Sequence, residues 1–167
     1  MTYDAKKLSE LTAHGMLCDF AEVSGGKLFI SGAGIGMIGV AQLEPPFRVF
    51  VSLAVIVQIP WGATNQQHRL EIELISEEGS ELKKIPLSEQ LPDGIDDSYR
   101  GSVVALFNAG RSPMMVNGEQ TLMPVAIPFQ GLELPQLGTY FFSIKIDGSE
   151  VDRVSFRMLS TSMVPNR

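Results

Sequence analysis

The residues best suited to recognising a ligand lie in one polar stretch that follows a long apolar run. Trp61 is the only tryptophan, and Thr64, Asn65 and His68 follow it closely. An aromatic ring beside hydroxyl, amide and imidazole groups suits a carbohydrate or a peptide. The competing interpretation is that Trp61 caps the end of a hydrophobic core and that its neighbours form an ordinary loop. One aromatic side chain does not make a pocket, so the sequence favours the second interpretation and keeps the first as an alternative.

The chain offers few groups for nucleophilic catalysis. It has one cysteine, Cys18, two histidines, His14 and His68, and no G-x-S-x-G elbow. A cysteine within a strand is usually a buried structural residue. The carboxylates Glu71 and Glu73 share one strand face, as is typical of a charged outer surface. Because no motif gathers a nucleophile, a base and an orienting acid, we predict no catalytic residues and no enzyme.

Two groups of residues could contribute to a metal site. Asp93, Asp96 and Asp97 stand in one loop and could offer oxygens to calcium, but they lack the spacing of a helix-loop-helix calcium loop. His14 and Cys18 could begin a zinc site, which would need further ligands. Neither set is complete, so we predict no cofactor and leave calcium binding by the acidic loop open.

A glycine-rich stretch matches a nucleotide-binding motif in spacing only. Residues 34–39 read Gly-Ile-Gly-Met-Ile-Gly, which fits the dinucleotide fingerprint. The fingerprint binds a pyrophosphate only where a helix begins at the glycines. Pro45 and Pro46 follow shortly, and the expected acidic position falls in the apolar run around Val55. The sequence therefore argues against nucleotide binding.

Composition excludes further classes of partner. The formal net charge is −6, which argues against nucleic acid or an anionic membrane as the partner. The longest apolar run, 49–59, is too short to span a bilayer. No apolar run follows Lys6 and Lys7, so we expect no secretory signal and a cytoplasmic protein. A length of 167 residues indicates a single domain with a sizeable core.

The stretch 48–75 organises these candidate groups. Along 49–59, apolar residues occupy most positions of both parities, so both faces of the strand are largely apolar. This predicts a central strand that is buried on each side. In 69–75 Leu70, Ile72 and Leu74 alternate with charged residues, which predicts a strand with one wet face. We expect the two strands to pair as a hairpin around the Trp61 loop.

The remaining segments indicate further strands. We expect strands at 16–23 and 27–31 joined by a Ser24-Gly25-Gly26 turn, an edge strand within 81–87, and strands at 101–108 and 121–129. The last of these contains Pro124 and Pro128, so it should be an edge or bulged. Asp147-Gly148 predicts a tight turn between strands at 140–146 and 151–158.

Together these signals predict an all-β fold, an antiparallel β-sandwich of about eight to nine strands. The predicted domain covers 16–160. Residues 1–15 form an N-terminal extension in which 4–14 could make a short helix capped by Asp4 and ended by Gly15, and 161–167 form a loose tail.

Several segments resemble an uncharacterised bacterial protein family, a domain of unknown function. The resemblance begins with Leu-Cys-Asp-Phe-Ala-Glu-Val at 17–23, Gly-Lys-Leu at 26–28 and Ser-Gly-Ala-Gly at 31–34. It continues at 60–61, 65–70, 138–140 and 146–148, and so covers most of the chain. These motifs are turns, strands and a loop. The resemblance therefore implies a bacterial origin but no activity and no catalytic residue.

The sequence thus predicts a module that binds a partner or ligand and does not catalyse a reaction. The first hypothesis is protein interaction or self-assembly as a homodimer, through the apolar strand at 103–107 and the adaptable side chains of Met114 and Met115. The alternative is binding of a small carbohydrate or peptide by Trp61, Thr64, Asn65 and His68.

Overall fold

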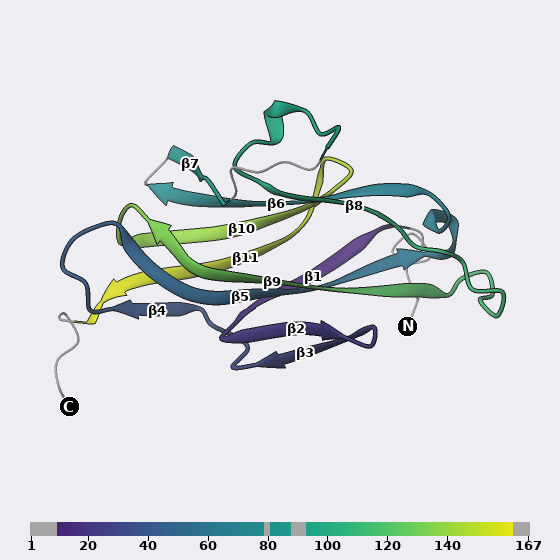
Figure 1. The fold of residues 1–167 in the computed structure, drawn as a ribbon, viewed down its shortest axis with the longest axis horizontal. Coiled ribbons are helices and arrows are strands. Elements are labelled where there is room, and N and C mark those ends of the chain that lie inside the picture. The colour runs from purple at the N-terminus through teal and green to yellow at the C-terminus, as the bar shows by residue number, and fades with distance from the viewer. Residues whose placement is uncertain (1–9, 79–80, 88–92, 162–167) are drawn as a thin grey trace, which may run out of the picture.

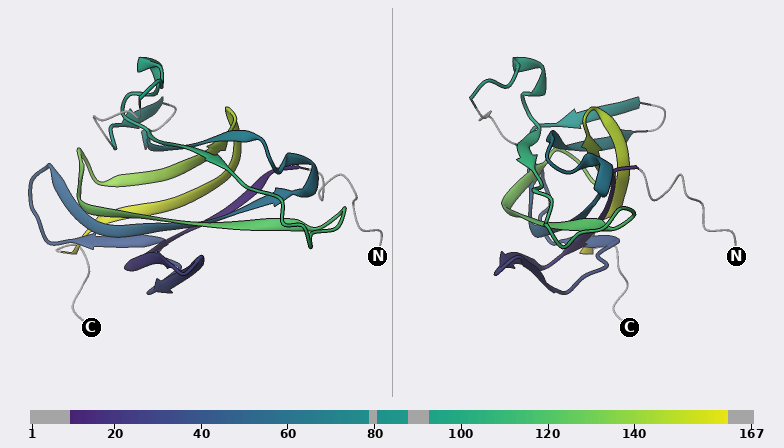
Figure 2. Two further views of the ribbon diagram at one scale, coloured as in Figure 1. Left: turned by 45° about the vertical axis from the view of Figure 1, so that its right-hand side comes forward. Right: turned by 90° about the vertical axis from the view of Figure 1, so that its right-hand side faces the viewer.

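The computed structural model describes residues 10–78, 81–87 and 93–161, and these residues form two packed β-sheets with a small hairpin outside them (Figures 1 and 2). Two short 3-10 turns, η1 and η2, accompany the strands. The elements are β1 (Thr12–Cys18), β2 (Phe20–Ser24), β3 (Lys27–Ser31), β4 (Met37–Val40), β5 (Phe47–Pro60), η1 (Trp61–Ala63), β6 (Gln67–Glu78), β7 (Glu81–Ile85), η2 (Asp97–Tyr99), β8 (Val103–Asn108), β9 (Gln120–Leu134), β10 (Gly138–Ile146) and β11 (Ser149–Ser160).

The first sheet has the order β1-β5-β9, with both pairings antiparallel. The central position predicted for the apolar strand is confirmed. Val51, Leu53 and Val55 face the core, and Ser52 and Ala54 on the other face are buried as well. That second face is covered in part because the β2–β3 hairpin lies against it.

The second sheet has the order β4-β11-β10-β6-β7, and β8 pairs with the first half of β6. The predicted all-β sandwich is confirmed, and the pairings are antiparallel except that β4 runs parallel to β11. The glycine-dense stretch 32–39 leads into strand β4 rather than into a helix, so the backbone of the dinucleotide fingerprint is not formed.

The hairpin predicted for 48–75 is wrong. β5 pairs with β1 and β9, whereas β6 pairs with β10, β7 and β8 in the other sheet. The chain crosses from one sheet to the other through η1 (Figure 1). Alternation of apolar residues specifies the face of each strand, but it carries no information on which strand becomes the neighbour.

The N-terminal helix predicted for 4–14 is also wrong where the structure describes it. Residues 1–9 lie outside the described part, and Thr12–Cys18 is strand β1. Gly15 does not end a helix but lies within this strand, where it allows a close approach between the sheets. A Cβ atom there would stand 2.5 Å from Ile144 Cδ1 and 2.7 Å from Val154 Cγ2.

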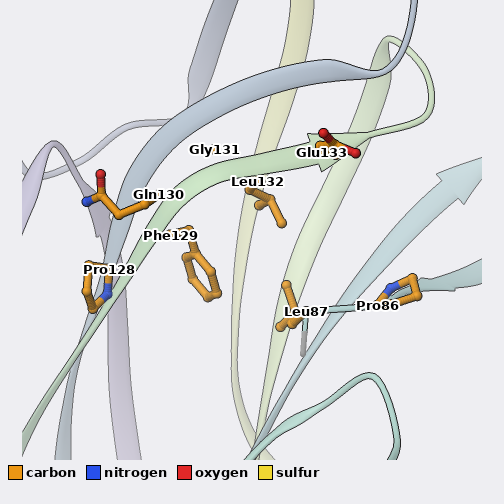
Figure 3. Close-up of a pocket in the computed structure, with 8 residues that line it drawn as sticks. All are labelled: Pro86, Leu87, Pro128, Phe129, Gln130, Gly131, Leu132 and Glu133. Atoms are coloured by element: carbon orange, nitrogen blue, oxygen red, sulfur yellow. The ribbon is translucent and has the colours of Figure 1, made fainter. Parts of the chain in front are cut away.

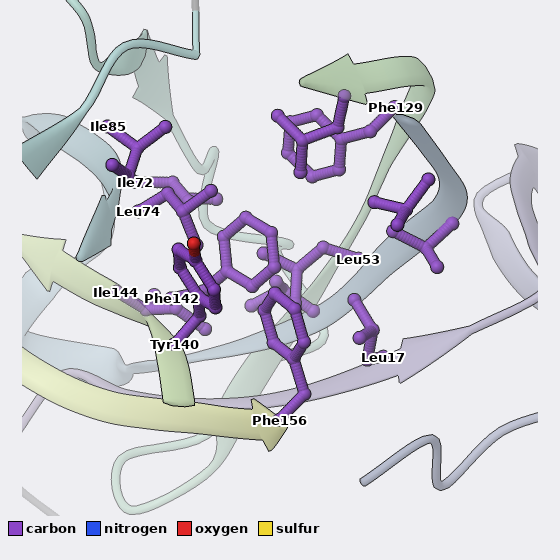
Figure 4. Close-up of a cluster of buried hydrophobic side chains, with 14 of the residues drawn as sticks. Leu17, Leu53, Ile72, Leu74, Ile85, Phe129, Tyr140, Phe142, Ile144 and Phe156 are labelled. Atoms are coloured by element: carbon purple, nitrogen blue, oxygen red, sulfur yellow. The ribbon is translucent and has the colours of Figure 1, made fainter. Parts of the chain in front are cut away.

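The core lies between the two sheets and is organised around aromatic rings (Figure 4). The ring centroid of Phe142 lies 5.2 Å from that of Phe129 on the first sheet and 5.8 Å from that of Phe156. Tyr140 stacks on Phe156 at 5.6 Å. Burial of each such side chain contributes about 1.5–3 kcal/mol. Contacts along this row therefore stabilise the packing of one sheet on the other.

Two turn predictions are confirmed in their backbone angles. Asp147 and Gly148, between β10 and β11, have φ values of 51° and 84°. Gly25 and Gly26, between β2 and β3, have φ values of 55° and 73°. Positive φ at both central positions produces the twist that a two-residue hairpin needs.

Strand β9 is an edge strand among the described residues, as its prolines predict. It pairs with β5 alone, and Pro124 and Pro128 share one parity. A proline is accommodated in a paired strand where its missing N–H would point away from the partner. The outward margin of β9 therefore lacks two donors, which disfavours the addition of a further strand.

Candidate functional site

The predicted ligand-binding residues gather where the crossover 60–66 meets the loop 109–119, at the right of Figure 1. Arg111, which the sequence did not single out, connects them. Its guanidinium carbon lies 3.6 Å from the centre of the Trp61 ring. Its Nε donates to Thr64 Oγ1 at 2.8 Å and its Nη2 donates to the Trp61 carbonyl at 2.9 Å. One face of the Trp61 ring is thus covered by a cation of the same chain.

Thr64 and Asn65 use their polar groups to hold the two loops together. The buried Thr64 hydroxyl donates to the Trp61 carbonyl at 2.7 Å while it accepts from Arg111. Asn65 has a φ of 58°, and its Oδ1 accepts the Arg111 backbone N–H at 2.9 Å. The Asn65 N–H donates to the Ala109 carbonyl at 2.8 Å. These contacts make a rigid loop junction.

His68 is buried at the start of β6 and contacts an acceptor with each ring nitrogen. Nδ1 lies 2.7 Å from Asp147 Oδ2, and Nε2 lies 2.8 Å from the Ala63 carbonyl oxygen. Burial alone would lower the pKa of His68, but the hydrogen bonds to Asp147 and to Ala63 outweigh it and raise the pKa. His68 therefore ties the crossover to the β10–β11 turn and is unavailable to an external ligand.

The two methionines of the predicted contact surface differ in their surroundings. Met114 is 87% exposed. Met115 is half-buried, and its sulfur accepts a hydrogen bond from the Thr121 hydroxyl at 3.6 Å. Both lie in the loop that carries Arg111, so the structure brings them to the same end of the molecule as Trp61. Strand β8, predicted to share that surface, packs Val103 and Phe107 against the core.

A polar cluster that the sequence did not predict lies on the outer face of the second sheet. Glu71 and Glu73 were expected on a wet strand face, but Glu71 is buried. The segment 93–102 rises over this face (Figure 1), and the fully buried Ser102 donates to Glu71 Oε1 at 3.1 Å. Only the fold shows that distant residues cover the strand, so alternation alone could not predict it.

Two lysines complete this cluster. Lys84 Nζ donates to Ser102 Oγ at 2.8 Å and pairs with Glu73 Oε1 at 2.9 Å, and Lys145 pairs with Glu73 Oε2. Burial alone would raise the pKa of Glu73, but the hydrogen bonds from Lys145 and Lys84 hold it below its usual value. A serine beside a lysine can form a nucleophile and base, which requires a neutral amine and access for substrate. Here Lys84 is paired with a carboxylate and Ser102 is enclosed, so the geometry favours a structural role.

The residues considered for metals do not assemble into a ligand set. Asp96 Oδ1 accepts the Ser98 N–H at 2.9 Å, and Asp97 pairs with Arg100 at 2.8 Å. Across residues 10–78, 81–87 and 93–161, no three His, Cys, Asp or Glu side chains could hold a metal ion together. Cys18 is fully buried and donates to the Ser52 carbonyl at 3.3 Å. Burial, and then the charge of Asp19, raise the pKa of the Cys18 thiol and make it a weak nucleophile.

A cavity of about 280 Å³ opens where β9 passes the segment after β7 (Figure 3). Phe129, Leu132 and Leu87 give it apolar walls, and Glu133 lies at its edge. Glu133 is bound there by Arg48, at 2.7 Å. The volume lies near the lower limit of small-molecule sites. Among the described residues that line the cavity, Glu133 is the charged side chain and Gln130 adds an amide.

Large apolar side chains are exposed on the hairpin side of the first sheet. We call this set the hairpin face and define it as Met16 on β1, Phe20 on β2, Phe29 on β3, Phe50 on β5 and Leu122 on β9. Phe20, Phe29 and Phe50 are 52%, 51% and 67% exposed. Alternation explains the arrangement, because Ala21 and Leu28 of the hairpin pack inward and so Phe20 and Phe29 point outward.

The comparisons with known proteins add a family and no activity. A search of curated proteins found no match. No helix of the described residues is long and apolar enough to cross a membrane. The model of a family of unknown function, DUF6941, matches residues 14–159, which confirms the resemblance to a family without an assigned role. This match covers most of the chain, and the protein belongs to the DUF6941 family.

Proposed function

We propose that this protein is a non-catalytic β-sandwich module that binds another copy of itself through the hairpin face. The observation that carries the proposal is the exposure of Phe20, Phe29 and Phe50 on one side of the molecule. Soluble monomers rarely expose large contiguous apolar patches, and those that do commonly use them for binding. Self-association and binding of a different protein would both use such a face, and a second copy is the version that can be tested directly.

The geometry favours contact through side chains rather than through a sheet edge. Pro124 and Pro128 remove donors from the open margin of β9. By contrast, a half-exposed phenylalanine offers on the order of 100 Å² of apolar surface, since a whole aromatic side chain buries roughly 150–250 Å². Three of them supply a substantial part of the roughly 800 Å² that each partner buries in a typical interface.

The alternative of a sugar or peptide site at Trp61 has less support. The Trp61 ring is stacked under Arg111, and the side chains of Thr64 and His68 are hydrogen-bonded within the chain. A cytoplasmic location is part of the proposal, and the free, buried thiol of Cys18 is compatible with it.

Sedimentation of the wild type and of a Phe29→Ser variant over a wide concentration range tests the proposal. Phe29 points away from the packing face of its hairpin, so the variant should fold normally. Covering about 100 Å² of apolar surface contributes about 2.5 kcal/mol before the costs of association. We therefore expect the dissociation constant of the dimer to rise about tenfold or more.

The matched control is Leu82→Ser on β7. Leu82 is 64% exposed but belongs to the other sheet, so its replacement should leave association unchanged. A wild-type protein that stays monomeric at the highest soluble concentration would contradict the proposal. Equal weakening by both variants would show that association is not confined to the hairpin face.

A further inference from the structure

His68 has a hydrogen-bonding environment that one protonation state alone can satisfy. A neutral imidazole has one donor nitrogen and one acceptor nitrogen, whereas the imidazolium ion has two donors. Here both partners are acceptors, namely the Asp147 carboxylate at 2.7 Å and the Ala63 carbonyl at 2.8 Å. The Asp147 carboxylate is fixed in turn, because its Oδ1 accepts the Arg69 backbone N–H at 2.8 Å. With Asp147 ionised, both hydrogen bonds can form together only when His68 carries a positive charge.

The other groups around His68 leave this requirement intact. Strand β8 presents the Phe107 ring, whose centroid lies 5.4 Å away and which carries no charge. Next in β6 comes Arg69, whose guanidinium lies over the ring of Tyr99. Glu10 and Glu150 line the same hollow of about 410 Å³ as Asp147, so the charges on that side are negative. The acidic surroundings favour the imidazolium, whereas Arg69 in β6 and Arg111, which is bonded to Trp61 and Thr64 in the crossover, oppose it.

The two partners of His68 belong to different structural units. Ala63 is part of η1, in the crossover 60–66 between the sheets, and Asp147 is in the turn that joins β10 to β11. The crossover in turn holds the loop 109–119, through the Arg111 contacts and through the Trp61 N–H, which donates to the Glu119 carbonyl at 3.1 Å. A single side chain therefore connects one end of the second sheet to both loops.

We propose that His68 is a pH-sensitive latch, which as an imidazolium fastens the crossover 60–66 to the β10–β11 turn and on losing one proton releases the crossover and loosens its hydrogen bonds to the loop 109–119. Without the second proton, one ring nitrogen directs a lone pair at an acceptor oxygen, and one of the two hydrogen bonds becomes a repulsion. The latch is independent of the hairpin face, which lies on the outer side of the first sheet. It would let a rise in pH change the shape of the Trp61 end of the molecule.

The sign of the effect follows from the raised pKa of His68. The unfolded chain has a histidine pKa of about 6.5, and the folded value is higher. The stabilisation by His68 is therefore complete below about pH 6.5 and is lost as the pH rises through the folded value. A switch triggered by acid would instead lose this stabilisation as the pH falls. The direction in which stability changes with pH therefore distinguishes the two kinds of switch.

The test uses two signals that the sequence makes specific. The chain has two histidines and one tryptophan, so imidazole nitrogen shifts and Trp61 fluorescence can each be assigned. Nitrogen shifts of the wild type should show His68 doubly protonated at pH 6.5. Trp61 fluorescence should change as His68 titrates, below the region near pH 10 where tyrosines lose protons.

Hydrogen exchange locates the release. The Asn65 amide is bonded to Ala109 and the Arg111 amide to Asn65, and both should exchange about tenfold faster after deprotonation, once corrected for intrinsic rates. A His68→Gln variant should lose the pH-dependent fluorescence change, whereas His14→Gln, on the exposed position of β1, should keep it. If His68→Gln does not fold, the wild-type measurements still decide. A neutral His68 at pH 6.5, or loop amides that do not respond to its titration, would overturn the proposal.

Discussion

At the scale of single residues, the chemically versatile side chains of this protein are engaged with partners inside it. The Ser102 hydroxyl lies between Lys84 and Glu71, and the Cys18 thiol donates to a backbone carbonyl. The imidazole of His68 is held on both sides. A reactive group needs a free lone pair or a removable proton that faces a substrate. These residues instead stabilise loops and strand faces.

The close approach at Gly15 leads to a prediction at the same scale. An added methyl group would overlap Ile144 and Val154 across the interior, and overpacking of this kind costs about 1–3 kcal/mol. Gly15→Ala should therefore lower the free energy of unfolding in urea by that amount.

The control for Gly15→Ala is Gly36→Ala, at a position where a Cβ atom would meet nothing within 4 Å. That variant should change the free energy of unfolding by less than about 0.5 kcal/mol. Equal stability of the wild type and Gly15→Ala would mean that the two sheets separate easily at this point.

At the scale of elements, the sequence predicted the faces of strands far better than their neighbours. Alternation correctly identified β5 as central, and Asp147-Gly148 correctly identified the β10–β11 hairpin. Pairing between β5 and β6 was wrong, because a short connection can cross between sheets as well as reverse within one. Strand β4 was missed, because it follows the glycine-dense stretch 32–36 and is defined by its pairing with β11.

The candidate sites were predictable only in part, for a related reason. Trp61, Thr64 and Asn65 form one junction as their proximity in the chain suggests, but the residue that covers them is Arg111. Likewise Ser102 covers Glu71 from a distant segment. Contacts between segments that are far apart in the chain leave no periodic signal in the sequence. The hairpin face leaves an ambiguous signal as well, because Phe20 and Phe29 alternate with the apolar Ala21 and Leu28.

The ion cluster on β6 gives a prediction about acid stability. The pKa of Glu73 is lowered in the folded protein, so its stabilisation is complete above the unfolded value of about 4.3 and is lost as the pH falls through the folded value. Glu73→Gln should remove this pH dependence and reduce stability at pH 7 by about 2 kcal/mol, the contribution of hydrogen bonds to charged groups.

Urea unfolding of the wild type and of Glu73→Gln between pH 2 and pH 7 measures both effects. Glu77→Gln, at the exposed end of the same strand, is the control and should leave both the stability and its pH dependence nearly unchanged. Parallel pH profiles for the wild type and Glu73→Gln would show that the cluster does not couple protonation to folding.

At the scale of the whole molecule, one row of aromatic rings connects the two sheets, which share no strand. Phe142 lies in the middle of this row, between Phe129 and Phe156 (Figure 4). Phe142→Ala should lower the free energy of unfolding by about 3–5 kcal/mol, because it removes a large buried side chain and leaves a cavity.

Chemical denaturation followed by circular dichroism checks this expectation, with the exposed Leu43→Ala as a control that should stay close to the wild type. A loss below about 1 kcal/mol for Phe142→Ala would mean that the sheets collapse around the gap and that the row is not the main connection between them.

The burial of Cys18 beneath the hairpin also makes its thiol a probe of local opening. The thiol is fully enclosed and packs with Ala21 of the hairpin and Ala54 of the sheet below. A disulfide reagent can reach it when the β2–β3 hairpin lifts away. Because the chain has no second cysteine, all labelling comes from Cys18, and its rate reports how readily the thiol becomes exposed.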